Sequence, residues 1–196
     1  MKKIFSIKNT IFNSATYILS NSITKEALLI DCGDIAPIVN YIDEHQLQLK
    51  GVFLTHSHFD HIYGLNELAH RYSHFPIYTS QHGAEGLKNP KLNMSRYHEG
   101  IQDFIYENEN IEILAEGQKI NIGEENIQMM ETPGHDWSCL TYQIGKYLFT
   151  GDSYIPKAKP QFNFPKGNKQ LYFLSEKRII NVAKTGNLTI MPGHIC

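Results

Sequence analysis

Apolar residues recur along the chain at two spacings, in short runs typical of strands and at intervals of three and four typical of helices. The strand-like runs are bounded by glycine, asparagine or charged residues. They predict strands at residues 15–19, 27–30, 51–54, 76–79, 111–114, 119–122, 127–130, 140–144, 146–149 and 188–191. The helical spacing predicts helices at about residues 35–42, 63–72, 81–87 and 171–182. Strands and helices alternate in both halves, which favours an α/β chain with two packed sheets and helices outside them.

Two longer segments show no clear periodicity and are predicted to be loops. Residues 88–106 are polar and contain Pro90 and Gly100. They are a candidate for a mobile loop at a substrate site, with an ordinary surface connection as the equal alternative. Residues 154–170 contain prolines, lysines and glutamines without a period. Asp34, just before the first predicted helix, is a candidate N-cap.

Length and composition favour a single domain over residues 1–196, long enough to bury a core without disulfides. The net charge of −2 argues against a protein that coats nucleic acid or anionic membranes. Cys32, Cys139 and Cys196 are odd in number and form no CxxC pair, which fits a reducing compartment. The sequence shows no signal-peptide pattern and no apolar run of transmembrane length. A soluble, cytoplasmic protein is therefore expected.

The densest candidate for chemistry follows directly on the predicted strand at 51–54. Three histidines and one aspartate occur within six residues, as His56, His58, Asp60 and His61. Imidazole and carboxylate groups suit zinc, and also iron or manganese. On an extended strand end His56 and His58 project from the same face, whereas the other two lie where the chain turns. One short segment can therefore serve two neighbouring metal ions.

Three further places each put one ligand-type residue directly after a glycine, just past a predicted strand. They are His135 in Thr-Pro-Gly-His, Asp152 in Thr-Gly-Asp and His194 in Pro-Gly-His. Glycine lets the backbone turn sharply and approach an ion closely. Each place alone is usually only a turn. Together with the first cluster they give seven ligands, a number that suits two ions sharing one bridging carboxylate and one bridging hydroxide.

These motifs resemble those of the metallo-β-lactamase superfamily, in particular its small glyoxalase-II-like branch. The pattern HxHxDH and the three later ligand motifs match, as does the strand-terminal Asp31-Cys32-Gly33. The resemblance spans nearly the whole chain. It implies an αβ/βα four-layer sandwich with the metals in a groove at one edge. It further implies that one ion is held by His56, His58 and His135, the other by Asp60, His61 and His194, with Asp152 bridging them.

The expected function is that of a binuclear metal-dependent hydrolase, in which a metal-bridging hydroxide attacks a small ester or thioester. Two divalent ions are expected, with zinc as the first choice and iron or manganese as alternatives. Asp60 is the candidate catalytic residue, because it can both ligate a metal and orient the nucleophile. Hydrolysis of lactones or phosphodiesters by the same site is a further hypothesis.

Other classes of function stay open. Persulfide dioxygenases resemble this chain in HxHxDH but hold a single iron with two histidines and one aspartate, so an oxidoreductase is the alternative. A metal-stabilised binding module without activity is a third hypothesis. Glyoxalase II is implied to carry an extra C-terminal glutathione-binding domain, and this sequence stops two residues after His194, which favours smaller thioesters. Metallo-β-lactamases lack an aspartate at the position of Asp152, which disfavours antibiotic hydrolysis.

Substrate contacts are predicted in the segment that follows Asp152. Lys157 and Lys159 are candidates to meet a substrate carboxylate or phosphate, and Tyr154 is a candidate proton donor. The alternative for the lysines is an ordinary exposed loop. A small, anionic substrate is expected, with no nucleic-acid or membrane partner. Asp31 is expected to support the metal ligands rather than to be one. Surface or packing positions are expected for the remaining histidines, His45, His70, His74, His82 and His98.

Overall fold

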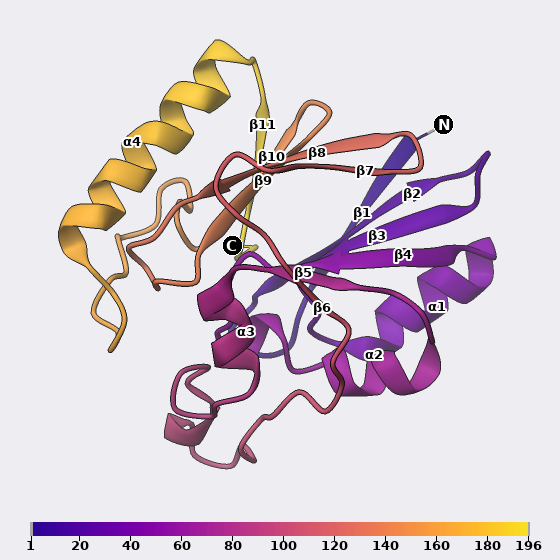
Figure 1. Ribbon diagram of the computed structural model, residues 1–196, viewed down its shortest axis with the longest axis horizontal. Coiled ribbons are helices and arrows are strands. Elements are labelled where there is room, and N and C mark those ends of the chain that lie inside the picture. Colours follow the sequence, from indigo (N-terminus) through magenta and orange to yellow (C-terminus); the bar gives the residue numbers. More distant parts are fainter. Residues whose placement is uncertain (1, 196) are drawn as a thin grey trace.

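The computed structural model describes residues 2–195, and Cys196 lies outside the described residues. Two β-sheets face each other and helices cover their outer faces, so the layers run helix, sheet, sheet, helix (Figure 1). The predicted αβ/βα four-layer sandwich is thereby confirmed.

The first sheet is built by the N-terminal half of the chain. Its strands are ordered β1-β2-β3-β4-β5-β6, antiparallel from β1 to β3 and parallel from β3 to β6. The strands are β1 (Lys2–Lys8), β2 (Ala15–Asn21), β3 (Glu26–Ile30), β4 (Gln48–Phe53), β5 (Ile77–Thr79) and β6 (Ile111–Ile113). The connections between its parallel strands carry the outer helices α1 (Ile35–His45), α2 (Leu65–Arg71) and α3 (Gln81–Leu87).

The second sheet is ordered β11-β10-β9-β8-β7 and is antiparallel except for the parallel pair β10–β11. Its strands are β7 (Lys119–Ile122), β8 (Glu125–Glu131), β9 (Leu140–Ile144), β10 (Tyr147–Gly151) and β11 (Thr189–Pro192). Helix α4 (Lys169–Thr185) lies in the connection from β10 to β11 and covers the outer face of this sheet (Figure 1).

Buried side chains form three clusters, one between each pair of neighbouring layers. In β4 and just beyond it, Val52 and Leu54 belong to the cluster beneath α1–α3, while Phe53 points into the cluster between the sheets. In β10, Phe149 lies between the sheets and Leu148 lies under α4. Successive side chains of a strand point to opposite faces. The unbroken apolar runs of the sequence therefore mark strands that are buried on both sides.

Strand β1 is absent from the sequence prediction. Its apolar side chains are divided between the two faces of an edge strand: Phe5 stacks on Tyr41 of α1 with ring centroids 4.6 Å apart, and Ile4 packs toward the cluster between the sheets. Neither face has enough apolar residues to give a period. The helix predicted at 63–72 is shorter in the structure, because residues 62–64 still form a turn after the 3₁₀ turn at Phe59–His61 and α2 begins only at Leu65.

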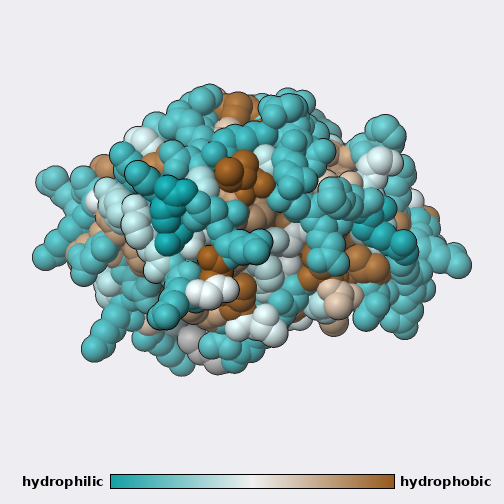
Figure 2. All heavy atoms as spheres, turned by 90° about the horizontal axis from the view of Figure 1, so that it is seen from below, coloured by the Kyte–Doolittle hydropathy of each residue, from teal (hydrophilic) through white to brown (hydrophobic). Residues whose placement is uncertain are grey.

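The surface on the side of α1–α3 is mostly hydrophilic, with hydrophobic residues in small separate groups (Figure 2). Among the residues that the structure describes, no helix is long and apolar enough to cross a membrane. The apolar side chains of the outer helices thus serve the core beneath them.

Candidate metal centre

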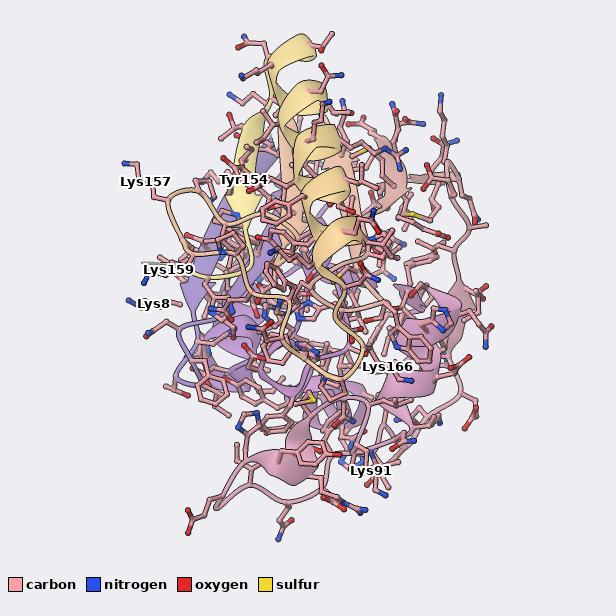
Figure 3. The ribbon with its side chains drawn as sticks, turned by 90° about the vertical axis from the view of Figure 1, so that its left-hand side faces the viewer. Lys8, Lys91, Tyr154, Lys157, Lys159 and Lys166 are labelled. Carbon is pink, nitrogen blue, oxygen red and sulfur yellow. The ribbon has the colours of Figure 1, made fainter. Side chains whose placement is uncertain are left out.

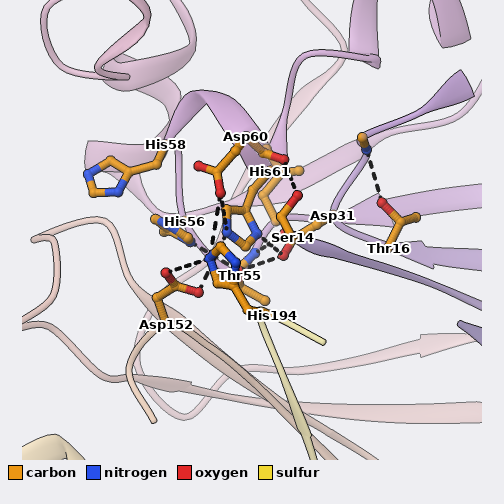
Figure 4. Close-up of polar contacts among 12 residues, drawn as sticks. Ser14, Thr16, Asp31, Thr55, His56, His58, Asp60, His61, Asp152 and His194 are labelled. Carbon is orange, nitrogen blue, oxygen red and sulfur yellow. Dashed lines mark hydrogen bonds and ion pairs between the residues drawn. The ribbon is translucent and has the colours of Figure 1, made fainter. Parts of the chain in front are cut away.

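All seven predicted ligands lie at one edge of the sandwich, where strands of both sheets end. Figure 4 shows six of them together, His56, His58, Asp60, His61, Asp152 and His194. Strand β4 leads into His56 and His58, and the 3₁₀ turn that follows carries Asp60 and His61. The second sheet supplies the other three ligands from the ends of β8, β10 and β11, namely His135, Asp152 and His194. The fold therefore gathers ligands from two halves of the chain into one place.

The ligands form two triads. In the first triad, His58 Nδ1 lies 3.0 Å from His135 Nε2, and the ring centroid of His56 lies 4.7 Å from that of His58. In the second, Asp60 Oδ2 lies 3.3 Å from His61 Nε2 and 3.5 Å from His194 Nε2. Within each triad the ligand atoms lie within 4.8 Å of one another. This grouping is the one that the sequence resemblance implied.

Asp152 lies between the two triads. Its Oδ2 atom is 3.6 Å from His135 Nε2 in the first triad and 3.1 Å from His194 Nε2 in the second. Its Oδ1 atom is 3.5 Å from His61 Nε2. One carboxylate thus reaches ligands of both groups, as a bridging ligand must.

The buried polar atoms of the centre fit a divalent metal. His56 Nε2, His61 Nε2 and Asp152 Oδ1 are buried and have no hydrogen-bond partner among the described residues. These three side chains also form a cluster of their own in which ligand atoms lie within 4.8 Å. Buried polar atoms without partners are costly, whereas a metal ion would satisfy all of them. Histidine and carboxylate donors suit zinc, iron and manganese alike.

In four of the five imidazoles, the nitrogen that faces away from the centre is held by an oxygen acceptor. Such contacts fix the ring orientation and leave the other nitrogen free for a metal. His61 Nδ1 lies 2.9 Å from Asp31 Oδ2, and His56 Nδ1 lies 3.2 Å from Thr55 Oγ1. Backbone carbonyls hold the other two, since His135 Nδ1 lies 2.8 Å from the oxygen of Gln161 and His194 Nδ1 lies 2.9 Å from that of Phe12.

Asp31 connects several of these contacts. It is buried, and its φ of 58° is a left-handed conformation that few non-glycine residues adopt. The carboxylate accepts hydrogen bonds from the backbone N–H and hydroxyl of Thr55, both at 2.7 Å, as well as from His61. Burial raises the pKa of Asp31, although these hydrogen bonds oppose the shift. Asp31 thus contacts a predicted ligand, as a supporting residue would, and its supporting role stays a prediction.

The local electrostatics favour the metal-binding protonation state at some of the ligands only. Burial, reinforced by neighbouring imidazoles, holds the pKa of His56 well below its usual range, and burial lowers the pKa of His135 to about 4. Burial acts to raise the pKa of Asp152, but the surrounding imidazoles of His61 and His135 outweigh it and hold that pKa well below its usual range. Neutral imidazoles and ionised carboxylates are the forms that coordinate metals. Burial acts to lower the pKa of His61 and of His194, but the carboxylates of Asp60 and Asp152 outweigh it and raise both, so metal binding at these two imidazoles would release protons.

Two glycines allow the C-terminal ligands to approach each other. Gly151 has a φ of 50°, and a Cβ there would overlap the side chain of Thr55. A Cβ on Gly193 would overlap Asp152 Oδ1 and crowd the backbone of Gly151. Only glycine fits these positions without displacing a ligand or its neighbour, which explains the Gly-Asp and Gly-His pairs.

A groove of about 460 Å³ opens beside the triads. Several ligands face it, among them Asp60 and Asp152. Two irregular segments, residues 88–106 and 154–170, contribute walls to it. Besides the metal ligands, its lining consists of Phe12, Met94, His98, Ile155, Ala158, Gln161 and Phe164. A second cavity of about 320 Å³ lies at the opposite end of the sheets, away from the ligand clusters.

The three predicted substrate contacts are not among the groove-lining residues. Lys157 and Lys159 are exposed and point outward from the loop (Figure 3). Tyr154 packs instead toward the cluster under α4, and its carbonyl accepts a hydrogen bond from Thr150 Oγ1 at 2.7 Å. Their loop does reach the groove, but through its apolar residues and Gln161. A substrate role for these three residues stays a prediction.

Two residues of the site have no role in the sequence prediction. Asp136 is buried, with Oδ2 3.6 Å from His58 Nε2, and its other oxygen accepts from the backbone N–H of Ser138 at 2.9 Å. Its position next to His135 is the one signal that could have revealed it. The ring of Phe164 covers two ligands, with centroids 5.0 Å from His58 and 4.8 Å from His135. Its place in an aperiodic loop gives no such signal.

The fold and the histidine–aspartate cluster together define a metal-dependent enzyme. The chain belongs to the metallo-beta-lactamase superfamily, whose family model matches residues 10–194. It is 31% identical over 138 residues to a hydroxyacylglutathione hydrolase of Bdellovibrio bacteriovorus. The aligned residues cover 69% of this chain and 47% of that protein. It is 28% identical over 174 residues to a probable metallo-hydrolase of Streptococcus pyogenes, and the aligned residues cover 86% of this chain and 73% of that protein. The chain spans about half the length of several hydroxyacylglutathione hydrolases that it matches.

Solved structures share the fold at lower sequence identity. The BLEG-1 B3 metallo-beta-lactamase superposes with a TM-score of 0.88 at 24% identity, covering 99% of this chain and 92% of that one. ETHE1 from Myxococcus xanthus superposes with a TM-score of 0.74 at 22% sequence identity, and the superposed region covers 99% of this chain and 76% of that one. TTHA1623, crystallised in a di-iron-bound form, superposes with a TM-score of 0.81 at 20% sequence identity. The superposed region covers 98% of this chain and 92% of that one.

Proposed function

We propose that this chain is a binuclear metal-dependent hydrolase that cleaves a small ester or thioester. The observation that carries the proposal is the position of Asp152, within 3.6 Å of ligand atoms in both triads. The similarity to hydroxyacylglutathione hydrolases supports a thioester as the substrate. Zinc is the ion we expect, while the di-iron form of a structural neighbour keeps iron as an alternative.

Different residues of the site would bind the metal ions and orient the nucleophile. When bound, divalent ions acidify a water to give a nucleophile at neutral pH and polarise the carbonyl oxygen of the substrate. The imidazoles of the first triad, His56, His58 and His135, each offer one ligand nitrogen toward the centre. Asp60 is both a member of the second triad and part of the groove lining, so its carboxylate can hold and orient the nucleophile.

The groove offers little acid assistance to a leaving group. Apart from the metal ligands, His98 is the one titratable side chain among the described residues that line it. A thiolate leaves readily without a proton donor, whereas an amine or alkoxide leaves poorly. This composition favours thioesters and activated esters over amides and simple esters as substrates.

An oxidoreductase is the second candidate. Asp152 and His135 lie 3.6 Å apart, and with His56 they would give one iron the two-histidine, one-carboxylate set of non-haem oxygenases. The structural similarity to ETHE1 concerns the fold alone.

Reconstitution of metal-free protein separates the two candidates. The protein is loaded with zinc, manganese or ferrous iron, its metal content is measured, and each form is assayed on thioesters, lactones and phosphodiesters. Oxygen consumption with a persulfide is followed in parallel. We expect two ions per chain and metal-dependent thioester cleavage. A single iron per chain together with persulfide-dependent oxygen uptake would replace the hydrolase by the oxidoreductase.

A further inference from the structure

We propose that the groove selects an uncharged substrate whose scissile carbonyl carries an apolar group, and that Phe12, Met94, Ile155 and Phe164 form the surface that contacts this group. The inference rests on the proposed hydrolase function and names the substrate class of the same site. It differs from the sequence-based expectation of an anionic substrate held by loop lysines.

The wall beside the first triad is aromatic. Phe164 packs its ring on both His58 and His135, with centroid distances of 5.0 and 4.8 Å. Ile155 and Ala158 of the same loop also face the groove. A substrate group bound on this side meets hydrocarbon and excludes water from it, which is favourable only if the group is itself apolar.

The wall beside the second triad is formed by Phe12 and Met94 together with His98. Phe12 and His98 are in contact, with ring centroids 4.9 Å apart. Phe12 as a residue is 53% exposed, and its carbonyl oxygen lies 2.9 Å from His194 Nδ1. An aromatic ring so exposed at the rim of a groove has no core to fill. Contact with a ligand would bury it.

The cations of the neighbouring loop are directed elsewhere. Lys157 and Lys159 point outward, and the ammonium group of Lys166 lies over the ring of Trp137, 4.2 Å from its centroid (Figure 3). No lysine or arginine occurs among the described residues that line the groove. A carboxylate on the substrate, away from the metals, would therefore be desolvated without a partner.

A series of thioesters with one leaving group tests the selection. Straight acyl chains of increasing length are compared with chains of equal length that end in a carboxylate. We expect kcat/KM to rise about fourfold per added methylene until the groove is filled. The carboxylate-ended chains are expected to be at least about tenfold poorer. Equal or better cleavage of the carboxylate-ended chains would overturn the proposal.

Three variants locate the effect. Phe164→Ala should flatten the dependence on chain length, and Phe12→Ala should weaken it while retaining the backbone carbonyl that holds His194. Met94→Lys should raise kcat/KM for carboxylate-ended chains relative to neutral ones. In the double variant Lys157→Ala/Lys159→Ala, we expect the ratio of kcat/KM for neutral thioesters to kcat/KM for carboxylate-ended thioesters to equal that of the parent protein. This result would show that the two lysines do not bind the substrate. A selective rise in KM for anionic substrates in this double variant would overturn the proposal.

Binding measurements keep the inference separate from the proposed activity. Alkyl hydroxamates of increasing length, with matched carboxylate-ended analogues, are titrated calorimetrically into the metal-loaded parent protein. Tighter binding with each methylene supports the apolar groove even if no thioester is turned over, in which case the hydrolase proposal fails alone. Affinity independent of chain length overturns the groove proposal even if thioesters are cleaved. Because the parent protein is used, folding defects of variants do not affect this result.

Discussion

At the scale of single residues, the proposed two-metal site depends on Asp152. Its two oxygens reach His61, His135 and His194 at 3.1 to 3.6 Å. We expect Asp152→Ala to lower metal-dependent turnover by at least about a hundredfold, with less than two ions bound per chain. The melting temperature should stay within a few degrees of the parent's, because the cores between the layers are untouched. Metal analysis, turnover and thermal melting of the two proteins test this.

The exposed Asp43 provides the matched control, since Asp43→Ala removes a surface carboxylate that accepts hydrogen bonds from Arg71 and Tyr72, far from the ligand clusters. Turnover and metal content should then equal those of the parent. Full activity of Asp152→Ala with one ion bound would contradict the two-metal mechanism itself.

At the same scale, we expect Asp136 to support metal binding through His58. The isosteric change Asp136→Asn keeps an oxygen to accept from the backbone N–H of Ser138, but it replaces the carboxylate oxygen 3.6 Å from His58 Nε2. Loss of such a supporting carboxylate typically lowers metal affinity about 10- to 100-fold. Competition with a chelator measures this affinity, and near-ultraviolet circular dichroism checks that the fold is retained. If affinity is unchanged, Asp136 serves only the turn that it caps.

At the scale of elements, Asp34 ties the β1–β2 connection to α1 and to the segment before α2. It precedes α1 as predicted, but its side chain does not cap the helix. Instead its carboxylate accepts from the N–H and hydroxyl of Thr10, both at 2.8 Å, and from the hydroxyl of Tyr63. Burial alone would raise the pKa of Asp34, and these hydrogen bonds lower it below its usual value.

This shift fixes the sign of a pH effect. Because the folded state favours the ionised carboxylate, the stabilisation is present above the unfolded pKa of about 3.9 and is lost as pH falls through the lower folded pKa. We expect Asp34→Asn to lower the free energy of unfolding of the metal-free protein at pH 7, and the difference to shrink toward pH 3. Urea unfolding across this range measures it. Glu44→Gln on the exposed side of α1 is the control, and a pH-independent difference would contradict the assignment.

The elements also show what a sequence can predict here. Strands covered on both faces, such as β4 and β10, appear as unbroken apolar runs, whereas the edge strand β1 does not. The ligands were predictable because they adjoin one another or follow a glycine at a strand end. The two segments beside the groove were predicted as candidate substrate loops, but the side chains that line it were not, because an aperiodic segment does not indicate which of its side chains point inward. Contacts such as those of Asn93, which donates to the carbonyls of Gly86 and Phe104, both at 2.9 Å, determine the path of the segment after α3.

A second element-scale prediction concerns the loop after Asp152. Trp137 is stacked between α3 and this loop, with its ring 3.9 Å from that of His82 and under the ammonium of Lys166. The same loop holds His135 through the Gln161 carbonyl. Trp137→Ala should raise hydrogen exchange in residues 160–168 and weaken metal binding moderately. Lys166→Met removes only the cation, so it should raise hydrogen exchange and weaken metal binding less than Trp137→Ala does. Unchanged exchange in Trp137→Ala would show that the stack does not hold the loop.

At the scale of the whole molecule, the metal centre joins the two sheets. Each triad takes ligands from both, with His135 completing the first and His194 the second. Backbone hydrogen bonds already link the sheets at this edge, from Leu140 to the Thr55 carbonyl and from Ala15 to the Gly193 carbonyl, both at 2.7 Å. The metal-free protein is therefore expected to stay folded, with the ions adding stability rather than creating the fold.

Removing the ions should accordingly lower the melting temperature without abolishing cooperative unfolding. A ligand that binds only the folded state at a free concentration one hundred times its Kd adds about 2.7 kcal/mol. For a chain of this size that corresponds to roughly 5–11 °C. Calorimetry before and after chelation, with metal content measured alongside, tests this. His135→Ala should reduce the shift, because it removes the only imidazole that the second sheet contributes to the first triad. An unchanged melting temperature after proven metal loss would mean that the ions bind without linking the sheets.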